Sequence, residues 1–443
     1  MRAGAIVAAA AAAGAMGLSL ACSAQASPPG SGHAVHATSS ASTGDPGRTA
    51  SPASPAPNIG KPTAGLVPAQ LEQAYNLGPL WRRGINGAHQ TIVIVDSFGS
   101  PTIASDLAAF DQAFGLRPPA SLRIIQPAGK VAPYQATSTR IGWASETTLD
   151  VEWAHAMAPG AGILLVETPT AENEGRTGFP QIVAAESYVI RHHLGQVISQ
   201  SFGATEETFR SPAVLRALRG AYELAARPAY AVTVLGASGD SAASGDTYNM
   251  QSLYPRRVVE WPATDPLVTA VGGTFLNLGP AGQRLAPDAA WSNSGGGQSA
   301  VFTRPAYQDG VRAITGPSRG IPDISMDASC ASSVALFASF PGTGPSHWQT
   351  ICGTSMATPL FAGVVALADQ VAGHSLGLIN PAIYRMSAAR DPGIVDIVSG
   401  SNSIVAGGHQ VTGFRAGPGY DLVSGVGTVN AAYFVPELAR LAG

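Results

Sequence analysis

The stretch "GTSMATPLFAGVVAL", residues 353–367, places Ser355 where a glycine-rich turn becomes an apolar helix of small residues. A serine in the first turn of a helix suits acyl transfer, because the N-terminal amides and the helix dipole favour negative charge there. Serine is also a common N-cap residue, so this stretch alone leaves a structural interpretation open. A nucleophilic serine needs a base, and no segment like "HGTH" supplies the usual histidine.

The composition argues against a nucleic-acid-binding protein and against a basic membrane-binding surface. The chain has 443 residues, of which 45% are apolar, enough for one large core or two medium ones. Charged residues make up only 12% of the chain, and the formal net charge is −3. We therefore expect no nucleic-acid partner and no polybasic membrane patch.

The N-terminal region predicts export. Residues 1–26 combine one arginine, an alanine-rich apolar run and a small-residue cleavage site at Ala24-Gln25-Ala26, as in a secretory signal peptide. We expect a secreted protein without stable membrane association. A lipoprotein anchored through Cys22 is the alternative, although Ser19 is a poor residue three places upstream. Residues 27–64 are rich in Pro, Ser, Ala and Gly, which predicts a disordered linker.

From residue 65 onward, short apolar runs alternate with helical patterns. The runs end in Gly, Ser or Asp and are typical of buried parallel strands: "TIVIVDSFG" (91–99), "GILLVET" (162–168), "VISQSFG" (197–203), "YAVTVLGASGD" (230–240) and "VTAVGGTFL" (268–276). Amphipathic helices are predicted over 104–115, 147–158, 178–193 and 211–226. This alternation predicts an α/β fold with a mostly parallel central sheet and helices on both faces. Functional groups collect at the carboxyl ends of such strands, where Asp96, Ser201 and Asp240 lie.

A pair of acidic residues could supply the base for Ser355. Glu146 and Asp150 are four residues apart, so they share one helix face with about 5–6 Å between their Cβ atoms. Two carboxyls this close share a proton, and the pKa of one of them rises. A solvated acidic face is the alternative, but the segment around the pair is apolar nearly all round. His155 lies roughly 140–180° around the helix from the two acids, so we expect it to be structural.

Asp240, in "VTVLGASGDSAASGD", ends a predicted strand in a glycine turn. Aspartate after glycine is a common turn former. A protonated carboxyl in a pocket can also donate a hydrogen bond to a developing oxyanion, a role that requires acid conditions.

Together, Ser355 in "GTSMATP", the "ETTLD" pair and Asp240 in "ASGDS" resemble the sedolisin family, the serine-carboxyl peptidases with a subtilisin-like fold. The likeness covers about residue 66 to the end, including "SQSFG", "WSNSGGGQSAVFTRPAYQ" and "PDISMDAS". The resemblance implies a three-layer peptidase domain over 65–443, acting on proteins or peptides through an acyl-enzyme. It implies Ser355 as nucleophile, Glu146 as general base and acid, Asp150 as its orienting partner and Asp240 as oxyanion donor. A carboxylate base suits catalysis at acid pH, because it stays partly ionised near pH 4, whereas a histidine is protonated there and cannot accept the serine proton.

The resemblance extends to a calcium site. "GIVDIVSGSNSI" and "RAGPGYDLVSGVG" resemble the family's binding loops. They map Asp396 and Asp421 as carboxylate ligands of one structural Ca²⁺, with backbone oxygens from Ile397, Gly417 and Gly419. Hard oxygen ligands of this kind suit calcium.

Two cysteines remain if the signal peptide is removed, Cys330 and Cys352, and the second lies three residues before Ser355. A disulfide between them would close a loop of about 20 residues and contribute about 3 kcal/mol to stability in the loop-entropy model. Two separate buried thiols are the alternative.

Two departures from the family leave a second function open. Family members usually carry a long propeptide, whereas only a short linker follows the signal-like segment here, and many relatives have tryptophan at Phe202. The alternative is a non-catalytic or propeptide-dependent secreted binding protein on the same scaffold. In either case we expect a monomer.

Overall fold

The computed structural model describes residues 48–49, 60–172, 177–344 and 346–443. The predicted signal peptide, with Cys22, and most of the predicted linker lie outside the described residues. Within the linker range, Arg48–Thr49 form β1, which pairs antiparallel with β3 (Leu122–Ile125) at one edge of the main sheet.

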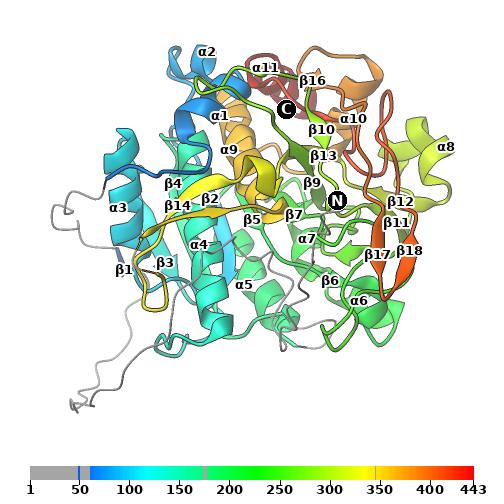
Figure 1. The fold of residues 1–443 in the computed structure, drawn as a ribbon, viewed down its shortest axis with the longest axis horizontal. Helices are drawn as coiled ribbons and strands as arrows, with labels where there is room; N and C mark the ends of the chain where they lie inside the picture. Colours follow the sequence, from blue (N-terminus) through cyan, green and yellow to red (C-terminus); the bar gives the residue numbers. More distant parts are fainter. Residues whose placement is uncertain (1–47, 50–59, 173–176, 345) are drawn as a thin grey trace, which may run out of the picture.

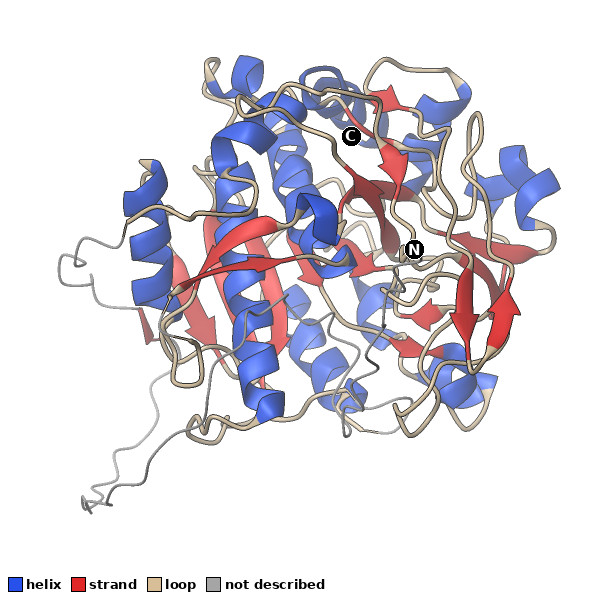
Figure 2. Ribbon diagram, viewed as in Figure 1, coloured by secondary structure: helices blue, strands red, loops and turns tan. Residues whose placement is uncertain are grey.

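A nine-stranded, mostly parallel sheet lies at the centre of the described chain (Figures 1 and 2). The strand order is β1-β3-β4-β2-β5-β7-β9-β10, and β13 also pairs with β9. The remaining strands of this sheet are β2 (Thr91–Ser97), β4 (Gly162–Thr168), β5 (Val197–Gln200), β7 (Thr233–Ala237), β9 (Thr269–Phe275), β10 (Ala289–Ala290) and β13 (Ile324–Asp327). Only β1 and β10 run antiparallel to their neighbours. The predicted α/β class is confirmed.

Both faces of the sheet are buried, which explains why its strands are continuous apolar runs. In β2, the side chains of Ile92 and Ile94 belong to one hydrophobic cluster, and those of Val93 and Val95 belong to another. Alternate residues of a strand point to opposite faces, so each cluster fills the space between the sheet and one helical layer.

Helices cover both faces of the sheet. They are α1 (Pro68–Ala74), α2 (Gly78–Trp81), α3 (Ile103–Phe114), α4 (Ser138–Met157), α5 (Phe179–Arg191), α6 (Pro212–Ala217), α7 (Gly220–Ala225), α8 (Arg312–Thr315), α9 (Thr354–Ala372), α10 (Asn380–Ala388) and α11 (Ala431–Ala442). Helices α4 and α9 pack on one face with α3 and α11, and α5 and α7 pack on the other (Figure 1).

The predicted helix 147–158 begins earlier, because the Thr137 side chain caps the observed N-terminus by accepting a hydrogen bond from Arg140 N–H. The predicted helix 211–226 divides into α6 and α7 just before Gly220, a poor helix former.

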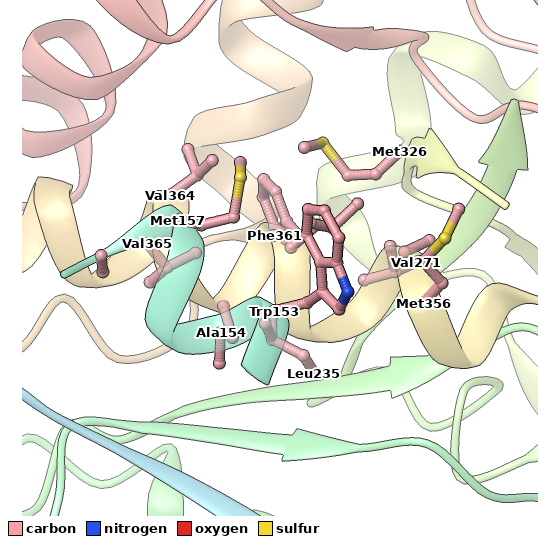
Figure 3. Close-up of a cluster of buried hydrophobic side chains, with 14 of the residues drawn as sticks. Trp153, Ala154, Met157, Leu235, Val271, Met326, Met356, Phe361, Val364 and Val365 are labelled. Carbon is pink, nitrogen blue, oxygen red and sulfur yellow. The ribbon is translucent and has the colours of Figure 1, made fainter. Parts of the chain in front are cut away.

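Helices α4 and α9 are in close contact. Figure 3 shows their side chains meeting around Trp153 and Phe361, beside Leu235 and Val271 of the sheet. A methyl group on Gly363 would lie 2.4 Å from Met157 Cβ, so only glycine allows this approach. Although α9 is long and apolar enough to cross a membrane, it is a mostly buried helix of the core.

Among the described residues, five two-stranded sheets lie outside the central sheet. They are β6 (Ala204–Thr205) with β8 (Glu260–Trp261), β11 (Gly297–Thr303) with β12 (Ser318–Ile321), β14 (Val334–Phe337) with β15 (Trp348–Ile351), β16 (Ile394–Val395) with β19 (Thr428–Val429), and β17 (Ile404–Ala406) with β18 (His409–Val411). A disulfide joins Cys330 to Cys352, in the turn before α9. The next residue, Gly353, donates its N–H to Ala328 O over 2.8 Å.

Candidate active site

The residues singled out from the sequence meet at the carboxyl ends of the parallel strands. Asp96 lies near the end of β2, Ser201 follows β5, and Asp240 lies just beyond β7. A cleft at this edge is lined by Ser201, Asp240, Ser355 of α9 and Glu146 of α4. The structure therefore brings together residues that are far apart in the sequence.

The turn that holds Ser355, the candidate nucleophile, depends on two residues whose backbones differ from those of ordinary residues, a glycine and a proline. Gly353 has φ 126°, a conformation that side chains disfavour, and it directs the chain into α9. Pro359 lies inside α9 and has no N–H to donate to Ser355 O, four residues earlier. The hydroxyl of Ser201 donates to that oxygen instead, over 3.2 Å.

The Ser355 hydroxyl lies between two acceptors. It donates to the carbonyl oxygen of Ser201 over a long 3.4 Å, and it is close enough to hydrogen-bond Glu146. Ser201 also donates to Asp150 Oδ1 over 3.0 Å. Ser201 thus links the second acid of the pair to the nucleophile, a role that sequence reasoning missed because the two residues are 51 positions apart.

The buried carboxyls of this site hold protons unusually strongly. Burial raises the pKa of Glu146 and Asp150 well above the ordinary range, and the charge on Asp96 raises both further. Burial, with the charge on Glu167, raises the pKa of Asp96 to about 7. Because Glu146 and Asp150 are at most 1% exposed, the group can carry little negative charge at once.

Asp240 is fixed beside the nucleophile by Thr354. Its Oδ1 accepts the Thr354 N–H over 2.7 Å and the Thr354 hydroxyl over 2.8 Å. The same hydroxyl oxygen accepts the N–H of Gly239 over 3.2 Å. The threonine immediately before the candidate nucleophile was the available signal for this contact.

The cleft has further lining residues that the sequence did not indicate. Apolar side chains come from Trp143, Phe202 and Met250, and additional carboxyls come from Glu172, Asp246 and Glu260. Among the described lining residues none is Lys, Arg or His.

His155 lies outside the cleft. Its Nε2 is 3.1 Å from Asp111 Oδ1 and 2.9 Å from the carbonyl oxygen of Arg117. The side chain is fully buried, and these contacts give it a structural role.

Two of the predicted calcium ligands, Asp396 and Asp421, accept hydrogen bonds from the turn that contains two others, Gly417 and Gly419. Asp421 Oδ2 accepts the N–H of Gly417 over 3.0 Å, and Asp396 Oδ2 accepts the N–H of Gly419 over 2.8 Å. Burial raises the pKa of Asp421, so a bound cation would stabilise its ionised form. The described residues contain no group of three or more His, Cys, Asp or Glu side chains suited to a metal. The donor set predicted from the sequence contains only two carboxylates, together with three carbonyl oxygens, and oxygen donors of these kinds suit calcium.

Comparisons with known proteins place the chain in a family. The subtilase family model matches residues 134–386. Kumamolisin from Bacillus sp. (strain MN-32) is 31% identical over 382 residues, covering 83% of this chain and 62% of kumamolisin. Sedolisin from Pseudomonas sp. (strain 101) is 28% identical over 359 residues, covering 78% of this chain and 57% of sedolisin. The chain thus spans about six-tenths of the length of these curated relatives.

A solved structure of a sedolisin also resembles the fold of this chain. Pseudomonas sedolisin, a serine-carboxyl proteinase complexed with two molecules of pseudo-iodotyrostatin, superposes with a TM-score of 0.70 at 25% identity. The match covers 86% of this chain and 99% of that one, which confirms the subtilisin-like fold. The chain therefore belongs to the subtilase family, within its sedolisin group.

Proposed function

We propose that this protein is a serine-carboxyl endopeptidase that hydrolyses proteins or peptides in acid. The observation that carries the proposal is the convergence of Ser355, Glu146 and Asp240 on one cleft at the strand ends, with Asp150 buried behind it and hydrogen-bonded to Ser201 of the lining. Its relatives and its family support the same activity.

In the proposed mechanism, Glu146 takes the proton of the Ser355 hydroxyl as the oxygen attacks the peptide carbonyl carbon. Asp150 accepts a hydrogen bond from Ser201, which holds the acid pair in place. The protonated carboxyl of Asp240 donates to the oxyanion, because Thr354 fixes it beside the nucleophile. The first turn of α9 adds the positive end of a helix dipole.

Collapse of the tetrahedral intermediate then breaks the carbon–nitrogen bond. Glu146 returns its proton to the leaving amine, and Ser355 keeps the acyl group as an ester. Water attacks this ester with Glu146 again accepting a proton, and the carboxylic acid product and the serine hydroxyl are regenerated. Burial raises the pKa of Glu146, so at acid pH only a part of the protein has this carboxyl ionised, and the ionised form is a stronger proton acceptor than an ordinary glutamate.

A calcium ion is proposed as a structural component. Asp396 and Asp421 would bind it through carboxylate oxygens, with carbonyl oxygens of Ile397, Gly417 and Gly419. Bound calcium would supply positive charge to a turn that gathers two carboxyls, and so stabilise the fold.

We also propose that the protein is exported and acts as a monomer. The signal-like N-terminal sequence supports export. The disulfide between Cys330 and Cys352 is of a kind that persists in oxidising compartments.

Cleavage of a denatured protein from pH 3 to pH 8 tests the proposed activity. We expect hydrolysis confined to acid, and its loss by at least a thousandfold in Ser355→Ala and Glu146→Gln, the scale seen when a nucleophile or base is removed. Glu152→Gln is the matched control, since Glu152 lies on the same helix but binds Phe337 N–H over 3.1 Å, away from the cleft.

The outcomes separate the two candidate functions. A rate maximum above neutral pH, or full activity in Glu146→Gln, would contradict the carboxylate base. A folded, calcium-loaded protein that cleaves nothing at any pH would favour the binding-protein alternative.

A further inference from the structure

Met250 lies in a closed loop beside the cleft. The loop is closed by a main-chain hydrogen bond from Thr247 N–H to Ser252 O over 2.9 Å, and Thr247 O accepts the N–H of Met250 over 2.7 Å. Met250 has φ 56°, a backbone conformation that is uncommon for a residue with a side chain. Its side chain lines the same cleft as Ser355. The loop backbone therefore holds a thioether at the wall of the candidate active site.

Met250 differs in its exposure from the other methionines that the structure describes. Each of the others is at most 1% exposed: Met157, Met326, Met356 and Met386. Met250 is half-buried, and it belongs to none of the hydrophobic clusters formed by the described residues. Of the described methionines, Met250 is therefore the one that a small solute in the cleft can reach.

We propose that Met250 is an oxidation site, and that its sulfoxide weakens the binding of substrates in the cleft. Hydrogen peroxide is the oxidant. One peroxide oxygen forms a bond to the thioether sulfur, the oxygen–oxygen bond breaks, and the other oxygen leaves as water with both hydrogens. The sulfur loses the two electrons that the peroxide gains. The effect on binding rests on the proposed peptidase function, whereas the oxidation of the sulfur does not.

The other sulfur atoms of the described chain are protected from this reaction. Cys330 and Cys352 are joined in a disulfide, so neither presents a thiol. Met356 directly follows Ser355 in the sequence, but it is fully buried. Because oxidation of a sulfur requires access to the oxidant, nearness to the nucleophile in the sequence does not make Met356 reactive.

The surroundings of Met250 explain why oxidation would weaken binding. Trp143, Phe202 and Ala237 provide further apolar surface in the lining of the cleft. A sulfoxide replaces a flexible apolar group with a polar one, whose oxygen is hydrogen-bonded to water. A substrate that covers this oxygen removes the water, at a cost in free energy. The hydrogen bonds between Ser355 and Ser201 are unaffected, so we expect KM to rise and kcat to stay unchanged.

The first test locates the oxidation without using the activity. Folded Ser355→Ala protein, which cannot digest itself, is treated with hydrogen peroxide and then unfolded, digested and analysed by mass spectrometry. We expect the sulfoxide to form at Met250 about tenfold faster than at any buried methionine. Unfolding the protein before the treatment should remove this difference, which controls for the intrinsic reactivity of each peptide.

The second test measures the effect on binding with an internally quenched peptide that has apolar residues around the cleaved bond. After oxidation of the wild type, we expect KM to rise about 5- to 20-fold while kcat stays within about twofold. Met250→Leu keeps an apolar side chain without sulfur, so its KM should not respond to peroxide. Met386→Leu, at a buried position, should respond as the wild type does. Methionine sulfoxide reductases should restore the KM of the oxidised wild type.

The outcomes separate the inference from the proposed function. Equal rates of oxidation at Met250 and at the buried methionines of the folded protein would overturn the assignment of the site. An unchanged KM in wild type whose Met250 is fully oxidised would overturn the effect on binding. An untreated wild type that cleaves neither peptides nor denatured protein would contradict the proposed function and the effect on binding, but the analysis of Ser355→Ala would still decide whether Met250 is the oxidation site.

Discussion

Ser201 and Ser355 bind each other in both directions: each hydroxyl donates to the main-chain oxygen of the other, over 3.2 Å and 3.4 Å. The first of these bonds replaces the helical bond that Pro359 cannot make. Because Ser201 also contacts Asp150, one strand-end residue is bonded both to the proposed nucleophile and to a member of the acid pair.

Ser201→Ala should therefore slow catalysis with little effect on substrate binding. We expect kcat to fall about tenfold, as for lost supporting hydrogen bonds, with KM unchanged, and the free energy of unfolding to fall by about 1 kcal/mol. Steady-state kinetics and urea unfolding measure the two effects. Ser199→Ala in β5, the strand that Ser201 follows, is the control, because the Ser199 hydroxyl has no partner among the described residues. Equal losses in the two variants would show that Ser201 has no special role.

Asp369 should make the protein less stable as pH rises. Burial raises its pKa from 3.8 to about 8, although the N–H of Leu376 binds one oxygen. Between these values the folded state keeps a proton that the unfolded state releases. The contribution of the Asp369 proton to the free energy of unfolding is therefore fully present below about pH 4. It is lost progressively up to about pH 8, and the total loss is at most roughly 6 kcal/mol.

Asp369→Asn removes this titration while keeping an oxygen for Leu376. Urea unfolding at pH 4, 6 and 8, in a Ser355→Ala background that prevents self-digestion, should show a shallower fall in stability than the parent. Glu437→Gln is the control, since Glu437 is paired with Arg440 near the surface. An unchanged slope in Asp369→Asn would refute the assignment.

The disulfide should stabilise the fold more than it assists catalysis. Cys330 and Cys352 are separated by 22 positions, so replacing both with serine should cost about 3 kcal/mol in the loop-entropy model. The nucleophile turn keeps its bonds from Gly353 to Ala328 and from Thr354 to Asp240. We expect kcat at low temperature to stay within about threefold of the wild type, as measured on denatured protein. A kcat loss that exceeds the loss of stability would instead make the disulfide part of the nucleophile's support.

Calcium should raise the unfolding temperature. Chelation is expected to lower the midpoint by several degrees, the scale of a few kcal/mol of binding energy. Asp396→Asn should abolish this response. Asp391→Asn should retain it, because Asp391 binds the nearby Gly393 N–H outside the predicted ligand set. Thermal unfolding with and without calcium measures both, and a response that survives in Asp396→Asn would place the ion elsewhere.

The long buried strands were predictable from the sequence because their surroundings are uniform. β2 and β4 are apolar on both faces, and their predicted ranges contain the observed ones. β13 was not predicted, because "ISMD" is short and two of its four residues are polar. Ser325 and Asp327 are fully buried. The Ser325 hydroxyl donates to Ser424 O and the Asp327 N–H donates to the Tyr75 hydroxyl, both far away in the sequence, and no local pattern can reveal such contacts.

The acid pair and the serine could be found because their signals are local. Glu146 and Asp150 share a helix face by spacing alone, and Ser355 follows a recognisable glycine turn. The contacts of Ser201 with Asp150 and with Ser355 depend on how the strands are ordered in the sheet. Those contacts required the three-dimensional structure.

Gly363 sets the distance between α4, which carries the proposed base Glu146, and α9, which carries the proposed nucleophile Ser355. Even a methyl group there would collide with Met157 and push α9 away from α4. The distance between Glu146 and Ser355 thus depends on the absence of a side chain at Gly363 in the core. Substitutions made in this part of the core to increase stability would therefore also change the distance between Glu146 and Ser355.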